Sequence, residues 1–285
     1  MSSPSRAADR SRWSRLHNSM SLKPFPGIDV LYRMTRVAIL ALAFSAAIFA
    51  ADSKDVNRTV ALHANGLVEI ETHKGSIRVT TWDRQEVEIQ ARIAAEPGTD
   101  MDRRRFEGTE VRIDSSPDSV RIKTYYPDFN WCCSFDNGTN PEVRYTIRMP
   151  KTARLTIRDH RSDTEVTGLQ GELDLTTHRG SAHLRRLGGA LHLDTYRGDA
   201  QVEFSSFTAD SSVKTYRGSI ELSMPKSSRL DLRTNSGRRG SIYTDFTVVT
   251  RAVNRKGESA HGAVNGGGPL LRIDAERGEV RVHAR

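Results

Sequence analysis

Arginine stands directly before glycine at nearly regular positions in the second half of this 285-residue sequence. The clearest copies are residues 177–180, 195–198 and 215–218, each reading Thr-X-Arg-Gly with histidine or tyrosine at X. Guanidinium groups form charge-assisted hydrogen bonds with carboxylates and phosphates, and neighbouring aromatic rings add cation–π or stacking contacts. Residues of these types at a fixed spacing could therefore hold an anionic ligand.

The spacing itself is a repeat. Gly180 and Gly198 are 18 residues apart, and Gly198 and Gly218 are 20 residues apart. Self-similarity at a fixed period is typical of stacked arrays, in which each unit contacts its neighbours. An earlier copy lies at residues 72–75, a late copy at 275–278, and a degenerate copy around residues 160–163.

The residues around each corner alternate between apolar and polar, which indicates strands with one buried face. Leu173 and Leu175 share one face before a corner, and Ala182 and Leu184 resume it afterwards. Glycine at the corner supplies a positive φ, and the threonine three residues earlier points inward, where its hydroxyl can bond the turn backbone. One two-strand unit cannot bury its inner face, whereas a stack of coils can.

We therefore predict an all-β fold, a parallel β-solenoid or flattened β-roll with coils of about 18–22 residues, preceded by a short β-rich N-terminal part. Equivalent strands would lie ~4.8 Å apart in two parallel sheets face to face. A short helix or turn is expected at 101–106 and a hairpin over 111–123. The structural turn glycines are predicted to be Gly75, Gly180, Gly198, Gly218, Gly240 and Gly278.

The chain begins with a polar segment, residues 1–33, which is either a disordered leader or the result of a mis-called start. Residues 34–50 read as a signal peptide, because a basic flank precedes an apolar run of fifteen residues that ends in small side chains. That run spans ~22 Å, less than the ~30 Å hydrocarbon layer, although an uncleaved signal anchor is the alternative. We expect export to the periplasm or cell surface, or secretion.

The remainder is predicted to be one continuous domain, residues 52–285. It consists of an N-terminal β region, 52–149, and the repeat solenoid, 150–285. Residues 1–51 hold seven of the 43 Lys and Arg and two of the 35 Asp and Glu, so the remainder has a net charge of about +3 rather than +8. Nucleic-acid binding is not expected from so small an excess.

Residues 142–204 and 262–282 resemble the bacterial putative-adhesin family of β-strand-repeat proteins, which is related to the head-GIN domain. Units of that family usually read Thr-Gly-Ser-Gly-Asp at the corner, whereas this chain has histidine or tyrosine followed by arginine. The resemblance covers roughly residues 55–285. It implies a β-strand-repeat fold and an exported or envelope-associated location, and it supplies no catalytic residues.

The corner positions form the candidate binding site. Stacking would align a basic column of Lys74, Arg161, Arg179, Arg197, Arg217, Arg239 and Arg277. Beside it would run a ring column of His73, His160, His178, Tyr196 and Tyr216, followed by Glu276. Such an edge could hold an anionic glycan, a lipid headgroup or another envelope component. The alternative is that these are soluble turn residues, partly neutralised by Asp163, Asp199 and Glu279.

Catalytic or metal chemistry has little support in the sequence. His160 and His178 could share a metal ion, but zinc sites need three or four ligands, and no cysteine or carboxylate cluster accompanies them. Glycan hydrolysis needs a concentrated pair of carboxyl groups, whereas acids such as Glu172 and Asp174 sit at dispersed strand positions. We predict no catalytic residue, metal or cofactor.

Residues 125–141 form an irregular stretch with five aromatic residues and the two cysteines, Cys132 and Cys133. Adjacent Cα atoms lie ~3.8 Å apart, below the usual ~4.4–6.8 Å of a disulfide, so a vicinal disulfide would be strained. Two free thiols or a bond to another chain are the alternatives. The loop is interpreted as a lid over one end or edge of the solenoid, with a partner-binding patch as the alternative.

Together these features predict an exported, non-catalytic β-solenoid that serves as an adhesin or as an envelope binding or scaffold protein. An envelope-stress sensor module and a self-assembling solenoid are alternatives from other classes. A glycan-active enzyme is the least supported of them.

Overall fold

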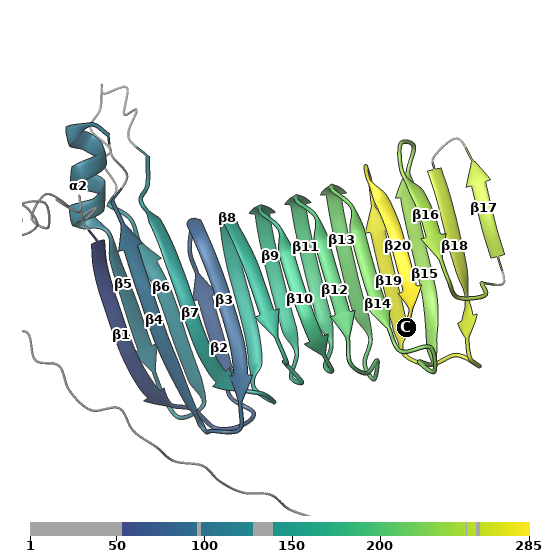
Figure 1. The fold of residues 1–285 in the computed structure, drawn as a ribbon, viewed down its shortest axis with the longest axis horizontal. Helices are drawn as coiled ribbons and strands as arrows, with labels where there is room; N and C mark the ends of the chain where they lie inside the picture. The colour runs from purple at the N-terminus through teal and green to yellow at the C-terminus, as the bar shows by residue number, and fades with distance from the viewer. Residues whose placement is uncertain (1–52, 96–97, 128–138, 249, 255–256) are drawn as a thin grey trace, which may run out of the picture. The chain divides into compact units, whose positions relative to one another are not determined.

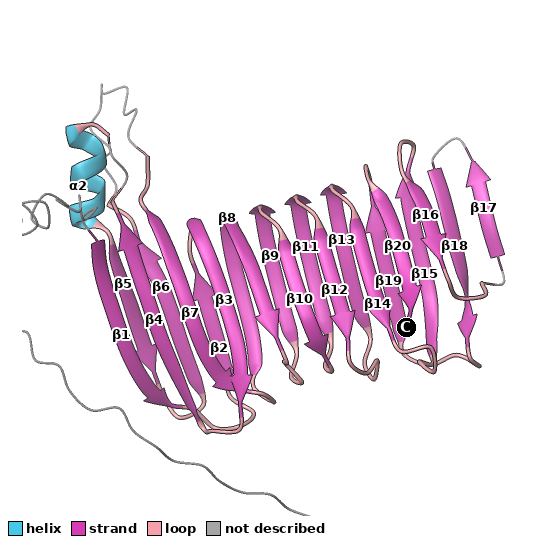
Figure 2. Cartoon of the chain, viewed as in Figure 1, coloured by secondary structure: helices cyan, strands magenta, loops and turns pink. Residues whose placement is uncertain are grey.

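The computed structural model describes residues 53–95, 98–127, 139–248, 250–254 and 257–285. Within them the chain is nearly all β, with strands β1–β20 and one helix, α2 (Figures 1 and 2). In chain order the elements are β1 (Ser53–Ala61), β2 (Leu67–Glu71), β3 (Lys74–Trp82), β4 (Glu86–Ala94), α2 (Asp100–Gly108), β5 (Glu110–Ser115), β6 (Ser119–Tyr125), β7 (Glu142–Pro150), β8 (Arg154–Thr167), β9 (Leu173–Arg179), β10 (Ala182–Leu187), β11 (Leu191–Arg197), β12 (Ala200–Phe204), β13 (Ser211–Arg217), β14 (Ile220–Met224), β15 (Leu230–Gly237), β16 (Ser241–Thr244), β17 (Thr250–Asn254), β18 (Gly257–Val264), β19 (Leu270–Ala275) and β20 (Glu279–Ala284).

Hydrogen bonds join these strands into one open, mostly parallel sheet, which folds into two rows at the long strand β8. The first row has the order β5–β6–β2–β8–β9–β11–β13–β19–β15–β18–β17. The second row has the order β1–β4–β7–β3–β8–β10–β12–β14–β20–β16. Each central coil thus contributes one strand to each row, which confirms the predicted solenoid.

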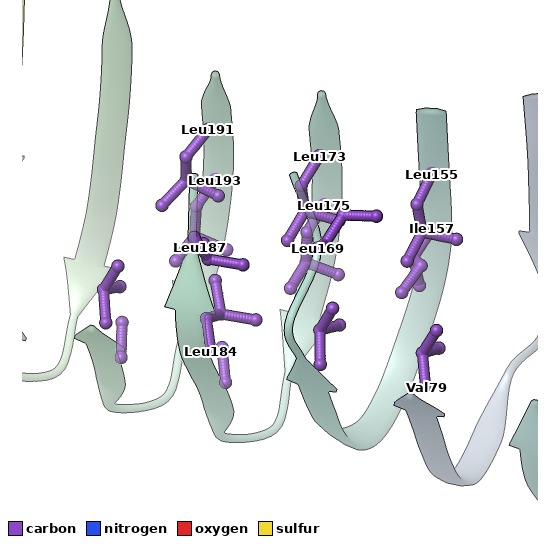
Figure 3. Packing of buried hydrophobic residues seen from close by; sticks show 14 of the residues in the cluster. Val79, Leu155, Ile157, Leu169, Leu173, Leu175, Leu184, Leu187, Leu191 and Leu193 are labelled. Atoms are coloured by element: carbon purple, nitrogen blue, oxygen red, sulfur yellow. The ribbon is translucent and has the colours of Figure 1, made fainter. Parts of the chain in front are cut away.

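The alternating apolar residues of both rows point into a single core. Figure 3 shows Leu155, Leu173 and Leu191 of the first row on one side of it, with Val79 and Leu184 of the second row on the other. These five side chains are at most 1% exposed. Burying a side chain of this size stabilises the fold by roughly 1.5–3 kcal/mol, so stacking supplies the core that one coil lacks.

The sequence period equals the step between coils. Leu155, Leu173 and Leu191 are in register across β8, β9 and β11, 18 residues apart at each step. The next step, from Leu193 on β11 to Val213 on β13, is 20 residues. Neighbouring strands therefore place equivalent side chains ~4.8 Å apart along the direction of stacking.

The coils do not stack in chain order, although the repeat suggests that they would. The last coil, β19 and β20, lies between two earlier coils: Val213 of β13 pairs with Ile273 of β19, and Leu271 of β19 pairs with Leu232 of β15 (Figure 1). The first coil, β2 and β3, likewise lies between β8 on one side and β6 and β7 on the other. Apolar alternation marks which face is buried and leaves the choice of neighbouring strand open.

The predicted turn glycines bring the corners of successive coils into close contact. Gly198 has φ +147°, and a Cβ atom on it would lie 1.8 Å from the carbonyl oxygen of Gly180. A positive φ is also found at Gly75, Gly180, Gly218 and Gly278. Gly240 differs, because its φ is not in the positive range. It still lies close to the next corner: a Cβ atom on Gly240 would lie 2.4 Å from the carbonyl oxygen of Gly278.

The coil of β15 and β16 corrects one detail of the sequence alignment. The alternation of Leu230, Leu232 and Thr234 predicts Thr234 as the corner threonine of this coil. In the structure Thr234 pairs with Ile273, and Ser236 occupies the corner position opposite Ala275. The strand before this corner, β15, has eight residues, compared with seven in β9, β11 and β13, and its turn holds one extra residue, Arg238.

The N-terminal part of the described chain agrees with the expected local elements. The hairpin predicted over 111–123 is the antiparallel pair β5–β6. The helix predicted near 101–106 is α2, capped where Thr99 and Asp102 each accept the other's backbone N–H. Residues 1–52, with the predicted leader and signal peptide, and 128–138, with Cys132 and Cys133, lie outside the described residues. In the residues that are described, no helix is both long and apolar enough to cross a membrane.

Candidate functional site

The basic column predicted from the sequence forms at the corners where the two rows meet. Lys74 is in register with Arg161, Arg161 with Arg179, and the series continues through Arg197 to Arg217. Arg277 continues the column, because Gly218 N donates to its carbonyl oxygen at 3.0 Å. Residues far apart in the sequence thus place one cation on each of six successive coils.

Arg239 lies beyond the end of this series. Ser241 of β16 pairs with Glu279 of β20, and Gly240 lies against Gly278, so Arg239 is level with Arg277 on the outermost of these corners. Its turn carries the extra residue Arg238. We call the six in-register cations the basic column, and we treat Arg239 as a neighbour of its C-terminal end.

The ring column also forms, and its rings stack face to face. Neighbouring ring centroids are 4.7 Å apart from His73 to His160, 4.7 Å from His160 to His178, 4.8 Å from His178 to Tyr196 and 4.9 Å from Tyr196 to Tyr216. Interplanar angles are 6–11°. The strand spacing imposes this separation, so the ring faces contact each other and only ring edges face outward.

Both ends of the ring column are closed by other side chains. At one end, Tyr126 meets His73 edge-on, with the centroids 5.8 Å apart. At the other end, the guanidinium of Arg277 lies 5.5 Å from the ring centroid of Tyr216, and Glu276 takes the place of a further ring. A ligand therefore cannot stack on these rings, as the sequence had suggested it could, and would meet their edges.

The arginine side chains of the basic column have no acidic or hydrogen-bonding partner among the described residues, although some of them contact rings. Across the described part of the chain, no ion pair or side-chain hydrogen bond is made by Arg161, Arg179, Arg197, Arg217 and Arg277. Arg197 and Arg217 contact only the rings beside them, with cation–π distances of 5.7 Å each. All five are exposed.

Three arginines on the strand faces, Arg78, Arg121 and Arg148, behave differently. Arg78 pairs with Glu165 at 3.0 Å, Arg121 with Glu69 at 2.8 Å, and Arg148 with Glu88 at 3.4 Å. Cross-strand pairs of opposite charge stabilise a sheet, whereas like charges directly opposite each other destabilise it. The basic column therefore keeps a row of like charges without carboxylate partners, whereas these three strand-face arginines are each paired with a glutamate on a neighbouring strand.

The carboxylates expected to neutralise the basic column have other partners. Asp163 accepts hydrogen bonds from the backbone N of Ser181 at 2.9 Å and from its hydroxyl at 2.6 Å, and these bonds lower the pKa of Asp163. Asp199 accepts from Ser219 N at 2.7 Å. Glu279 forms an ion pair with Arg281. Asp163 and Asp199 connect successive coils, and within the described residues none of the three acids forms an ion pair with a guanidinium of the column.

Two histidines of the ring column, His73 and His160, are held toward their neutral forms. Partial burial, and then the charges of His160, Arg161 and Lys74, lower the pKa of His73. Partial burial, and then the charges of His178, Arg161 and Arg179, lower the pKa of His160. The Nδ1 atom of His73 is buried and has no hydrogen-bond partner among the described residues, which further disfavours a doubly protonated ring.

A metal shared by His160 and His178 does not fit this geometry. The two rings are nearly parallel, with an interplanar angle of 11° and centroids 4.7 Å apart. The lone pair of an imidazole nitrogen lies in the plane of its ring, so two stacked rings cannot both direct lone pairs at an ion between them. The described residues also contain no group of three or more potential metal ligands among His, Cys, Asp and Glu.

Beneath the corners runs an inner column of mostly threonine side chains, which includes one acid that the sequence analysis did not single out. Asp159 occupies the position equivalent to Thr177, in register with it. Its Oδ1 accepts a hydrogen bond from Ser162 N at 2.9 Å, and its buried Oδ2 has no partner among the described residues. Burial raises the pKa of Asp159 to about 7. In the sequence, Asp159 could have been identified as an acidic residue at a position where other coils have an inward-facing threonine.

The threonines themselves vary in their bonding. Thr177 Oγ1 lies 3.2 Å from the carbonyl oxygen of Arg179, which confirms the predicted bond to the turn backbone. The hydroxyls of Thr195 and Thr215 are buried and have no hydrogen-bond partner in the described part of the chain. The common role of these residues is therefore to fill the space inside the corner, with the turn bond present in one coil.

A semi-open groove of about 470 Å³ adjoins the C-terminal end of the ring column. Its lining includes Tyr216, Glu276 and Lys214, together with Gly237 and Gly257, which contribute backbone without side chains. Gly237 stands where other coils carry a ring or Glu276, so the groove begins where the column of rings stops.

The sequence matches the model of a family described as Toastrack DUF4097 over residues 51–265. No curated protein matches the chain. Among solved structures it is similar to a putative cell adhesion protein from Clostridium sporogenes ATCC 15579, with 9% identity and a TM-score of 0.48 over 82% of this chain and 100% of that chain. It is also similar to a putative adhesin from Bacteroides fragilis NCTC 9343, with 11% identity and a TM-score of 0.35 over 81% and 97%. A putative lipid binding protein from Parabacteroides distasonis ATCC 8503 shares 10% identity, with a TM-score of 0.25 over 82% and 96%.

Proposed function

The chain belongs to the Toastrack DUF4097 family, and from this premise we propose that it is an exported, non-catalytic β-solenoid that attaches to anionic glycans of a cell envelope or surface. In this proposal the basic column is the binding surface, and the rest of the solenoid is a rigid support. The role is that of an adhesin or envelope-binding scaffold.

The observation that carries the proposal is the row of unpartnered arginines. Four like charges, Arg161, Arg179, Arg197 and Arg217, lie on directly neighbouring strands without a carboxylate between them. Like charges in register reduce stability by a few tenths of a kcal/mol per pair, up to about 1 kcal/mol. A bound polyanion would remove that repulsion and would satisfy the guanidinium donors through charge-assisted hydrogen bonds.

The same surface offers little to a catalytic mechanism. Glycoside hydrolysis uses two carboxyl groups that flank the scissile bond. Along the basic column, the carboxylates of Asp163 and Asp199 are engaged by backbone N–H groups of the next coil, and Asp159 lies beneath the corner. The exposed groups are cations and the edges of rings, which suit binding without bond cleavage.

The arrangement of the terminal strands gives less support to the alternative function, self-assembly by end-to-end stacking. Among the described strands, the first row ends in the antiparallel pairs β5–β6 and β17–β18, and the second row begins with the antiparallel pair β1–β4. These terminal pairs lack the two-strand corner of the repeat. A second copy therefore could not continue both columns across the junction.

A binding assay on immobilised acidic polysaccharide tests the proposed function. Replacing Arg179, Arg197 and Arg217 together by alanine should weaken retention about tenfold or more, since each exposed charge contact contributes up to about 1 kcal/mol. The matched control replaces three strand-face arginines, Arg78, Arg121 and Arg148, and removes the same net charge. Equal retention of the two triple variants, with both folded by circular dichroism, would remove the basic column from the proposal.

A further inference from the structure

We infer that the basic column binds a linear acidic polysaccharide of the polyuronate type, which lies across the strands, along the direction of coil stacking, with successive carboxylates on successive arginines. This inference rests on the proposed function and makes it specific. It assigns the polymer an orientation, a register and a length of contact.

The straightness and the spacing of the column argue for a linear polymer. Its rungs follow unbroken strand register, so the cations repeat every ~4.8 Å along one line. In a linear polyuronate every sugar residue carries one carboxylate, so a chain that lies along the column presents a row of anions to the row of cations. A small anion would contact only one or two rungs.

Acidic residues limit the length of the contact. At one end of the column, Lys74 lies 3.8 Å from Glu142. At the other end, Glu276 sits beside Arg277 at the position where earlier coils carry a ring. The uncompensated stretch between them contains four arginines, Arg161 to Arg217, which spans about 14 Å at the usual strand spacing. About four carboxylates should therefore complete the contact.

The stacked rings determine how the sugars are recognised. The faces of His160, His178 and Tyr196 are covered by neighbouring rings, so a sugar cannot pack flat against them. Ring edges present hydroxyl and imidazole groups, which can donate to or accept from sugar hydroxyls beside each bound carboxylate. The ionised carboxylate supplies affinity, and neutral glycans should bind weakly.

Two other anionic partners fit this edge less well. Single-stranded nucleic acids gain affinity by stacking bases on free aromatic faces, and the column leaves none free. Membrane-surface binding uses apolar side chains inserted below the headgroups. Of the large apolar side chains exposed in the described residues, Tyr125, Tyr196, Tyr243 and Val253, only Tyr196 belongs to the column, and its ring is stacked on both sides.

Calorimetry with oligogalacturonates of one, two, four, six and eight residues tests the inference. Affinity per oligomer should rise about two- to fivefold with each added carboxylate up to about four, and should then level off. Methyl-esterified oligomers of the same lengths should not bind measurably. Raising the salt concentration should weaken the tetramer far more than the monomer.

Single substitutions test the register. Replacing Arg197, in the middle of the uncompensated stretch, by alanine should reduce tetramer affinity by about threefold or more. The matched change at Arg78 on a strand face should alter it by less than about 1.5-fold. Both variants should keep the melting temperature of the wild type within a few degrees.

The outcomes separate this inference from the proposed function. Equal affinity for monomer and tetramer would overturn the linear register and leave anion binding in place. Binding to vesicles of anionic phospholipid, without binding to any oligogalacturonate, would overturn the polysaccharide inference in favour of a lipid partner. Undiminished tetramer binding by the Arg179, Arg197 and Arg217 triple variant would overturn both.

Discussion

The hydroxyl of Thr177 lies 3.1 Å from Oδ1 of Asp159, the residue that occupies the same inner position one coil earlier. The inner column therefore contains one ionisable group in a series of mostly threonine side chains. Burial, together with the nearby charge of Asp163, raises the pKa of Asp159 to about 7.

The buried carboxyl should make stability depend on pH in a direction set by this raised pKa. The native state holds the proton more tightly than the unfolded chain, in which the pKa is 3.8. The stabilisation is therefore fully present below about pH 4 and is lost as the pH rises toward 7. Asp159→Asn, which mimics the neutral acid, should be about 1–3 kcal/mol more stable than wild type at pH 8 and nearly equal to it at pH 4. Urea denaturation at pH 4, 6 and 8 measures the difference, and parallel curves would contradict the buried environment.

The histidine stack should have the opposite dependence. The pKa values of His73 and His160 are lowered from 6.5, so near that pH the native state binds fewer protons than the unfolded chain. Their contribution is present above about pH 6.5 and is lost as the pH falls below it. His160→Tyr extends the uncharged stack and should reduce the loss of melting temperature between pH 7.5 and 5.5 by about 1–3 °C.

His183→Tyr is the control for that experiment. His183 lies on a strand face, 3.1 Å from Gln201, and outside the ring column. Its replacement should leave the acid sensitivity of the protein unchanged. The same change in acid sensitivity for both variants would show that the stack is not its source.

The corner glycines should tolerate no side chain. Gly198→Ala places a methyl group 1.8 Å from the carbonyl oxygen of Gly180 at φ +147°. We expect a loss of about 3 kcal/mol or more, because the strained backbone and the contact with rigid backbone atoms add together. Arg197→Ala, one residue away and exposed, should change stability by less than about 0.5 kcal/mol. Similar denaturation midpoints for the two variants would contradict this packing.

The last coil should be indispensable, because it lies inside the stack. Deleting residues 270–285 removes β19 and β20 and leaves β13 and β15 without a shared neighbour. We expect the cooperative thermal transition to be lost. A truncated chain that still melts cooperatively near the wild-type temperature would instead indicate stacking in chain order.

Local chemistry made much of the fold predictable. Period-two alternation identifies the buried face of each strand, and the Arg-Gly corner marks where one strand ends and the next begins. The 18- and 20-residue steps then place Arg179, Arg197 and Arg217 in one column, since equal coils bring equal positions into register. These features are predictable because each depends only on residues within one coil or on the spacing between two adjacent copies of the repeat.

The tertiary structure decided what depends on distant pairing. Insertion of β19 between β13 and β15 joins strands about 40 to 60 residues apart, and alternation is the same for every candidate neighbour. The burial of Asp159 and the stacking of His178 on Tyr196 also depend on which side chains lie on the adjacent coil. The repeating unit and its columns of charges and rings therefore follow from the local pattern of residues. The order of the coils, the covering of the ring faces and the lack of ion pairs at the column arginines among the described residues depend on the packed array.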